Sequence, residues 1–137
     1  IYVNGNNKRG IGHIYRALEI ADEFYVKPDI YYDVNQTDPK VFGMTTHTLI
    51  PINGIAELFD LCKRENYVIF INDILTTSID YRIGLRSVLP NAKIINFEDD
   101  GEGVYKADLV FNALYSESIL PQVYAGEKYY IAGKTFM

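Results

Sequence analysis

Short apolar runs alternate with helix-spaced apolar stripes along this chain, and that alternation restricts its fold more than any other feature. The clearest run, 67–71, is nearly all apolar, as strands buried on both faces of a parallel sheet are. We predict strands at 1–3, 29–34, 67–71, 93–97 and 109–111, weaker strands at 45–50 and 129–131, and helices whose stripes begin at Ile14, Ile55 and Tyr81. This order predicts an α/β fold: a Rossmann-like, mostly parallel sheet with helices on both faces.

The length of 137 residues suits a single domain, 1–137, and 48% hydrophobic with 23% charged residues is typical of a globular chain. No apolar run approaches the roughly 18 residues that cross a bilayer, so we expect a cytoplasmic protein without a membrane span. The formal net charge of −5 argues against nonspecific nucleic-acid binding. The single cysteine, Cys62, shares an apolar stripe with Leu58 and is interpreted as core. Because Ile1 already begins a strand, we expect one module of a longer polypeptide.

A glycine-rich loop, 5–12, follows the first predicted strand and leads into a helix. Glycines let backbone approach a ligand closely, and the first turn of a helix offers N–H groups and a favourable dipole to an anion. Lys8, Arg9 and Arg16 add positive charge in an acidic chain. The segment therefore predicts a site for a phosphorylated ligand, although such loops also serve as plain strand-to-helix connections.

His13 begins the helix that follows this loop and is the best candidate for chemistry. An imidazole titrates near neutrality, so it can take a proton from water or from a hydroxyl at physiological pH. The alternative is a histidine that only caps the loop or donates to a phosphate. His47 has no partner in its threonine-rich stretch and is interpreted as a surface or structural residue.

Polar residues follow the other predicted strands, at the edge where ligands of such sheets collect. Asn72 and Asp73 follow one strand, the acidic loop 98–102 with Asp99 follows the next, and Asn112 follows the last. Asn72 and Asp73 either cap their strand or face a ligand. The acidic loop lacks the spacing of a calcium site and has no histidine partners for zinc, so we expect no metal.

Two familiar nucleotide-binding motifs do not fit the opening loop. A P-loop requires Gly-Lys-Ser/Thr at the helix start, where this chain has Gly12-His13-Ile14. A dinucleotide fingerprint requires a third glycine at Tyr15, although Asp33 lies where its ribose-binding acid would be expected. We therefore expect no cofactor.

The segment 10–18 resembles the Gly-x-Gly-His-x-x-Arg signature of the UDP-sugar hydrolases of pseudaminic acid synthesis. It is also similar to the related predicted glycosyltransferases named after spore coat polysaccharide biosynthesis. Later segments that match this group in order are 72–75, 97–101, 107–115 and 124–129. The resemblance therefore covers nearly the whole chain.

The resemblance implies a GT-B architecture of two Rossmann-like halves facing a cleft, of which this chain is the N-terminal half. His13 would be the base that activates water, without a metal, and the neighbouring glycines would make room for substrate. The nucleotide would be held mostly by the C-terminal half, so this half alone should bind weakly and be inactive. We expect substrate contacts from Gly10, Gly12, Arg16, Asn72, Asp73, Asp99 and Asn112.

Two hypotheses about function follow. In the first, the parent protein hydrolyses a UDP-sugar or transfers its sugar in surface polysaccharide or nonulosonic (sialic acid-like) acid synthesis, with His13 as general base. In the second, the domain is a noncatalytic module that binds a phosphorylated ligand.

Overall fold

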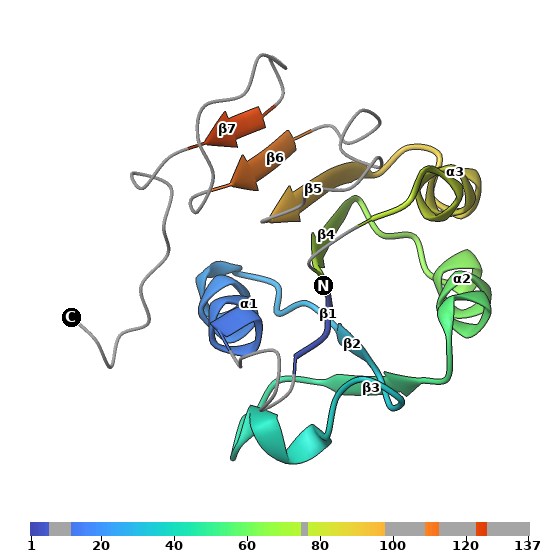
Figure 1. The fold of residues 1–137 in the computed structure, drawn as a ribbon. Helices are drawn as coiled ribbons and strands as arrows, with labels where there is room; N and C mark the ends of the chain where they lie inside the picture. The colour runs from blue at the N-terminus through green and yellow to red at the C-terminus, as the bar shows by residue number, and fades with distance from the viewer. Residues whose placement is uncertain (6–11, 75–76, 98–108, 113–122, 126–137) are drawn as a thin grey trace.

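The computed structural model describes residues 1–5, 12–74, 77–97, 109–112 and 123–125 (Figure 1). Its first half contains β1 (Tyr2–Val3), α1 (Gly12–Glu23), β2 (Ile30–Asp33), the 3-10 helix η1 (Pro39–Phe42), β3 (Leu49–Ile52) and α2 (Ile55–Arg64). The second half contains β4 (Ile69–Asp73), α3 (Ile79–Val88), β5 (Lys93–Phe97), β6 (Leu109–Asn112) and β7 (Val123–Ala125).

In the described part of the chain, seven strands form one sheet in the order β3-β2-β1-β4-β5-β6-β7. Every recorded pairing is parallel, with Tyr2 of β1 opposite Tyr31 of β2 on one side and Asn72 of β4 on the other. The chain order reverses at β1, whose neighbours are β2 and β4. This confirms the predicted Rossmann-like α/β fold and places its topological switch point between β1 and β4.

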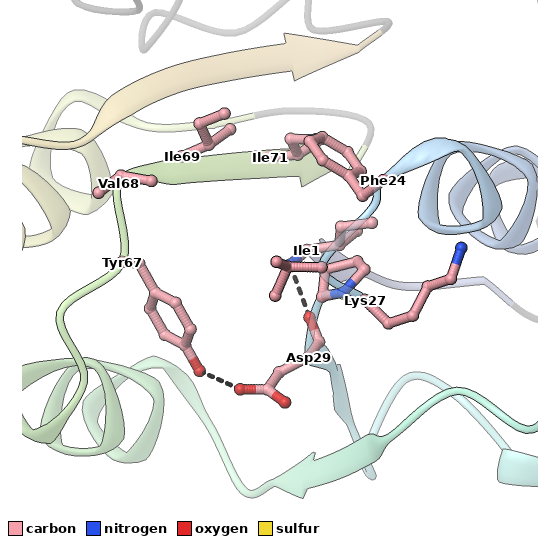
Figure 2. Close-up of a pocket in the computed structure, with 10 residues that line it drawn as sticks. Ile1, Phe24, Lys27, Asp29, Tyr67, Val68, Ile69 and Ile71 are labelled. Carbon is pink, nitrogen blue, oxygen red and sulfur yellow. Dashed lines mark hydrogen bonds between the residues drawn. The ribbon is translucent and has the colours of Figure 1, made fainter.

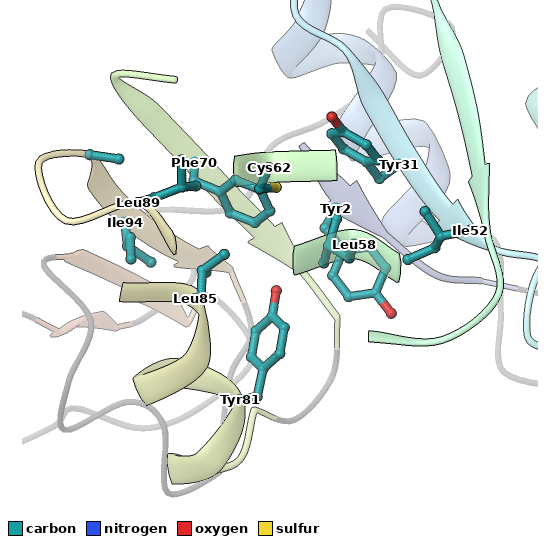
Figure 3. Close-up of a cluster of buried hydrophobic side chains, with 11 residues drawn as sticks. Tyr2, Tyr31, Ile52, Leu58, Cys62, Phe70, Tyr81, Leu85, Leu89 and Ile94 are labelled. Carbon is teal, nitrogen blue, oxygen red and sulfur yellow. The ribbon is translucent and has the colours of Figure 1, made fainter. Parts of the chain in front are cut away.

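Helices cover both faces of the sheet: α1 lies on one side, and α2 and α3 lie on the other (Figure 1). Consecutive strand residues point to opposite faces, so the strands β1 to β5 supply residues to both cores. The core under α1 contains Val3, Ile14, Ala17, Ile30 and Ile71. The core under α2 and α3 contains Tyr2, Tyr31, Leu58, Cys62, Phe70, Leu85 and Ile94 (Figure 3).

The described helices begin and bury their faces for identifiable reasons. In α1 the buried residues Ile14, Ala17 and Ala21 follow helical spacing. Ser78 caps α3, because its Oγ accepts a hydrogen bond from the backbone N–H of Tyr81 at 3.1 Å. None of the helices in the described ranges is long and apolar enough to cross a membrane.

Strand boundaries differ by more than one residue from the predictions in two places in the described part of the chain. The weak strand predicted at 45–50 is found at Leu49–Ile52, as β3. It runs through Pro51, a residue without a backbone N–H, which is tolerated because β3 is an edge strand of the described sheet. The strand predicted at 67–71 is shifted to 69–73, which puts Asn72 and Asp73 inside β4 instead of after it.

Other differences lie outside the predicted elements. Neither η1 nor β7 was predicted, and the strand predicted at 129–131 lies outside the described residues. The start of η1 is nonetheless encoded locally, since the Asp38 carboxylate accepts from the backbone N–H of Lys40 at 3.0 Å and Pro39 follows it. The predicted strand at 93–97 coincides with β5.

Candidate functional site

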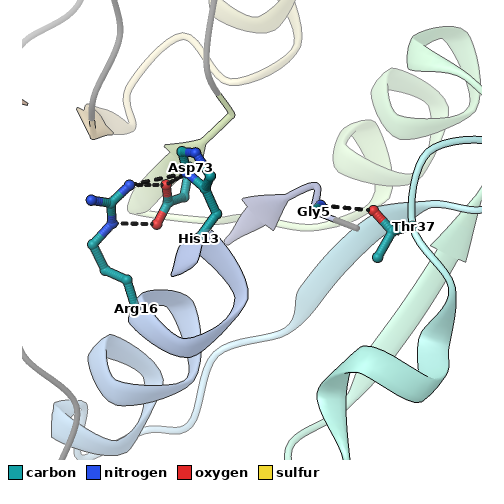
Figure 4. Close-up of polar contacts among 5 residues, drawn as sticks. All are labelled: Gly5, His13, Arg16, Thr37 and Asp73. Atoms are coloured by element: carbon teal, nitrogen blue, oxygen red, sulfur yellow. Dashed lines mark hydrogen bonds and ion pairs between the residues drawn. The ribbon is translucent and has the colours of Figure 1, made fainter. Parts of the chain in front are cut away.

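Three side chains, from His13, Arg16 and Asp73, form a cluster at the carboxyl edge of the sheet (Figure 4). His13 is the second residue of α1, and Arg16 lies three residues on, on a neighbouring face of the helix. Asp73 is the last residue of β4. The helix that follows β1 and the end of β4 meet at the switch point, where ligands of this fold bind.

The Asp73 carboxylate is the centre of the cluster. Its side chain is 0% exposed, whereas the side chains of Arg16 and His13 are 11% and 21% exposed. Arg16 grips both carboxylate oxygens: its Nε donates to Oδ2 at 2.7 Å and an Nη donates to Oδ1. The two-point pairing compensates the cost of burying the carboxylate charge.

The geometry assigns the proton of the His13 ring. Nδ1 of His13 lies 2.5 Å from Oδ1 of Asp73 and 3.1 Å from Nη2 of Arg16. A guanidinium only donates, so Oδ1 of Asp73 accepts from both neighbours if Nδ1 carries the proton. We assign that tautomer from this hydrogen-bond network. The neutral ring then has its lone pair on Nε2, where it can accept a proton from a ligand.

Arg16 is held from a second direction by an aromatic ring. Its Cζ lies 5.3 Å from the centroid of the Phe97 ring, at the end of β5, which is within the range of a cation–π contact. The guanidinium therefore lies between β4 and β5 and orients Asp73. The contact of Arg16 with substrate stays a prediction.

Asn72 lies on the other face of β4, although it is adjacent to Asp73. Its Nδ2 donates to Oδ1 of Asn96 at 2.9 Å, and its Oδ1 accepts from the Tyr81 hydroxyl at 2.5 Å. All three side chains are buried under α3. The alternation of the strand thus brings Asp73 to His13 and directs Asn72 into a structural network.

Sequence reasoning missed the anchor of the glycine-rich loop, which is Thr37. Its Oγ1 accepts from the backbone N–H of Gly5 at 3.1 Å (Figure 4) and donates to Oδ1 of Asn4 at 3.1 Å. The same Asn4 oxygen accepts from the backbone N–H of Asp33 at 2.9 Å. The exit of β1 is thereby tied to the exit of β2.

Asp33, where a dinucleotide-binding acid would be expected, takes part in its own turn. Its Oδ1 accepts from the backbone N–H of Asn35 at 2.8 Å and from the Asn35 side chain at 3.1 Å. Such Asx turns are common after strands. The sequence signal for this arrangement is the Asp itself, because a short carboxylate can accept from the backbone N–H two residues on.

Of the remaining predicted site residues, two lie within the described ranges and two lie outside them. Gly12 is the first residue of α1, and among the described residues no atom lies within 4 Å of where its Cβ would be. Asn112 ends β6, opposite Ala125 of β7. Gly10 and Asp99 lie outside the described residues. His47 pairs with Asp22 at 2.7 Å, away from the cluster, which agrees with a structural role.

No group of three or more His, Cys, Asp or Glu side chains in the described segments is arranged to hold a metal ion. The acidic loop 98–102 lies outside those segments.

The cluster offers one proton acceptor, the Nε2 atom of His13, at the ligand-binding edge of a Rossmann-like sheet. Its carboxylate partner is fixed by an arginine. No family model matches this chain, and no curated protein matches it.

Proposed function

We propose that this domain belongs to an enzyme that acts on a UDP-activated sugar, by hydrolysis or by glycosyl transfer, with His13 as general base. The observation that carries the proposal is the 2.5 Å contact between Nδ1 of His13 and Oδ1 of Asp73 at the switch point of the sheet. The resemblance of 10–18 and the later segments to nucleotide-sugar enzymes supports the choice of substrate. Surface polysaccharide or nonulosonic acid synthesis is the pathway class that this resemblance suggests.

In this mechanism Asp73 holds the ring with its Nδ1 proton toward the carboxylate, and Nε2 removes a proton from the attacking oxygen. That oxygen forms a bond to the anomeric carbon as the bond between this carbon and the phosphate oxygen breaks, and UDP leaves. The imidazolium that forms is stabilised by Asp73, as in other carboxylate–histidine pairs. General base catalysis of this kind contributes about 10²–10⁴-fold to a rate.

In this proposal, the C-terminal half of the same polypeptide is the partner that binds the nucleotide. Two donors of Arg16, Nε and one Nη, already bind the Asp73 carboxylate, and the guanidinium packs over the Phe97 ring. A diphosphate therefore needs other donors, which the glycine-rich loop and a second half would supply.

The test compares two histidine variants in the polypeptide that joins this domain to its second half. UDP release is measured over a panel of UDP-sugars, and His47→Ala is the matched control because His47 pairs with Asp22, away from the cluster. His13→Ala should lower turnover by about 10²–10⁴-fold, whereas His47→Ala should leave it unchanged. Unchanged UDP release in His13→Ala would remove the base assignment.

A second arm separates transfer from hydrolysis and from mere binding. Adding candidate acceptor sugars should raise UDP release and yield a glycosylated product if the attacking oxygen belongs to an acceptor. Water as the nucleophile predicts the same rate with and without acceptors. If the polypeptide binds UDP-sugars tightly without turnover, and His13→Gln binds them equally tightly, the noncatalytic module would be favoured instead.

A further inference from the structure

The dipeptide Asn-Gly occurs twice in the sequence, and each copy follows a strand at the carboxyl edge of the sheet. Asn4-Gly5 follows β1 and Asn53-Gly54 follows β3, so both lie at the opposite end of the strands from the pocket drawn in Figure 2. A β-branched residue, Val3 or Ile52, precedes each asparagine. The two copies are therefore matched in local sequence, and a difference in their reactivity would come from the fold.

An asparagine followed by glycine can rearrange spontaneously. The glycine nitrogen gives up its proton and attacks Cγ of the asparagine, the new C–N bond closes a succinimide ring, and the side-chain amide takes up a proton and leaves as ammonia. Water then opens the ring at either carbonyl, which gives aspartate or isoaspartate. Glycine favours the reaction because no side chain obstructs the attack. The attacking nitrogen and the leaving amide must both be free to move.

At Asn53-Gly54 neither of these groups is held. Asn53 is exposed, and within the described segments no hydrogen bond is recorded for its Nδ2 or for the backbone N–H of Gly54. Oδ1 of Asn53 accepts from Nδ2 of Asn35 at 2.7 Å, which stabilises the negative charge that develops on this oxygen during the attack. Gly54 has a φ of 91°, which other residues rarely adopt, so the turn itself requires the glycine that makes Asn53 reactive.

At Asn4-Gly5 the fold holds both groups. The backbone N–H of Gly5 donates to Oγ1 of Thr37 at 3.1 Å (Figure 4), and Nδ2 of Asn4 donates to the Tyr2 hydroxyl at 2.9 Å. Oδ1 of Asn4 also accepts from the backbone N–H of Asp33 at 2.9 Å. Because the attack must first break these bonds, it requires a local opening of the folded chain.

We propose that Asn53 deamidates spontaneously in the folded chain, whereas the hydrogen bonds of Asn4-Gly5 protect that pair from the same reaction. The product adds a carboxylate at position 53, beside Glu57, whose Oε2 accepts from the backbone N–H of that residue at 2.9 Å. Isoaspartate also routes the backbone through Cβ and Cγ. The modification therefore changes both the charge and the covalent length of the connection between β3 and α2.

The test incubates the 137-residue chain in mildly alkaline buffer, folded or in urea, and follows both sites by mass spectrometry after cleavage with trypsin. Asn53 is the only asparagine in the fragment 41–63, and Asn4 lies in the fragment 1–8, where fragmentation spectra locate the modified residue. Asn53→Gln is the matched control, because the longer side chain does not form a succinimide. Its fragment 41–63 should stay unmodified.

In the folded chain Asn53 should deamidate at least about tenfold faster than Asn4, with isoaspartate as well as aspartate among the products. In urea the two sites should deamidate at nearly equal rates, because their local sequences match. Equal rates in the folded chain would overturn the proposal, and so would aspartate without isoaspartate at position 53, the product of direct hydrolysis. A rate at Asn4 that stays low in urea would show that the fold does not protect it, which also contradicts the proposal.

Discussion

His13 and Asp73 are 60 positions apart in the sequence, yet Nδ1 of His13 lies 2.5 Å from Oδ1 of Asp73. The order of the sheet explains this contact, because β1 and β4 are neighbours and α1 starts directly beyond β1. The proton acceptor and the carboxylate that orients it therefore come from the two sides of the switch point. Arg16, one turn into the same helix as His13, completes the cluster.

Arg16 should be essential to the stability of the cluster, because Asp73 is a fully buried charge. Arg16→Met should lower the free energy of unfolding by about 3–5 kcal/mol, since it leaves the carboxylate without its main partner. Arg16→Lys should cost less, because it keeps the charge but loses the two-point geometry. Urea denaturation measures both, with the exposed Arg64→Met as the control, expected within about 0.5 kcal/mol. Equal stability of Arg16→Met and Arg64→Met would contradict the buried pairing.

Thr37 should contribute through its hydroxyl and not through its volume. Thr37→Val, which has nearly the same shape, removes the bond to the Gly5 N–H and one of the two bonds to Oδ1 of Asn4, and should cost about 1–3 kcal/mol in unfolding free energy. Thr37→Ser should restore most of that loss. The exposed Thr46→Val serves as the matched control in the same denaturation experiment. A Ser variant as unstable as the Val variant would show that the methyl group, not the hydroxyl, matters.

The packing of α3 against α2 depends on a glycine. A Cβ on Gly84 would lie 2.5 Å from Cε2 of Phe59, whose ring stacks on Tyr81 with centroids 5.9 Å apart. Gly84→Ala should therefore destabilise the chain by about 1–3 kcal/mol, because the clash outweighs the higher helix propensity of alanine. In a Phe59→Ala background the clash is absent, so the same substitution should stabilise by up to about 1 kcal/mol. Urea denaturation of the four chains in this cycle would detect the reversal of sign, and its absence would contradict the close approach of the helices.

Cys62 should be chemically inert in the folded chain. Burial raises the pKa of its thiol to about 11, and only the thiolate reacts with disulfide reagents. At pH 8 the thiol should react at least about 10²-fold more slowly than in the unfolded chain. The stability contribution of this group should fall as pH rises from the ordinary thiol pKa toward 11, because the unfolded chain releases the proton first. Since the sequence contains one cysteine, the absorbance of the released reagent reports this site alone. Native reactivity equal to that of an unfolded chain would contradict the burial.

The sequence predicted those parts of the fold that are encoded locally. The run at 93–97 became β5, and the stripe that begins at Tyr81 became the buried face of α3, because apolar periodicity acts within a few residues. The strand β3 was misplaced because Pro51 is tolerated only by virtue of its place at the sheet edge. Edge position is a property of the whole sheet and leaves no local signal.

The candidate site was predicted in part for the same reason. His13 and Asp73 were both singled out, since His13 begins the helix that follows the first predicted strand and its loop, and Asp73 stands at the end of another strand in a parallel pattern. Which of Asn72 and Asp73 faces His13 depends on where β4 ends. The predicted strand ended at 71 and β4 ends at Asp73, so the sequence did not show which of the two side chains faces His13. The pairing of Arg16 with Asp73 and the anchoring of Gly5 by Thr37 join segments far apart in the sequence, so only the folded chain reveals them.

The tautomer of His13 tests the central claim most directly, and it can be measured on this chain alone. Nitrogen-15 NMR of the imidazole rings at a pH where they are neutral distinguishes a protonated from an unprotonated ring nitrogen, and His47 is the only other histidine. We predict that His13 carries its proton on Nδ1, with Nε2 unprotonated, and that Asp73→Asn disturbs this preference. A His13 ring protonated on Nε2, with Nδ1 accepting from Arg16, would contradict the assignment of Nε2 as the base.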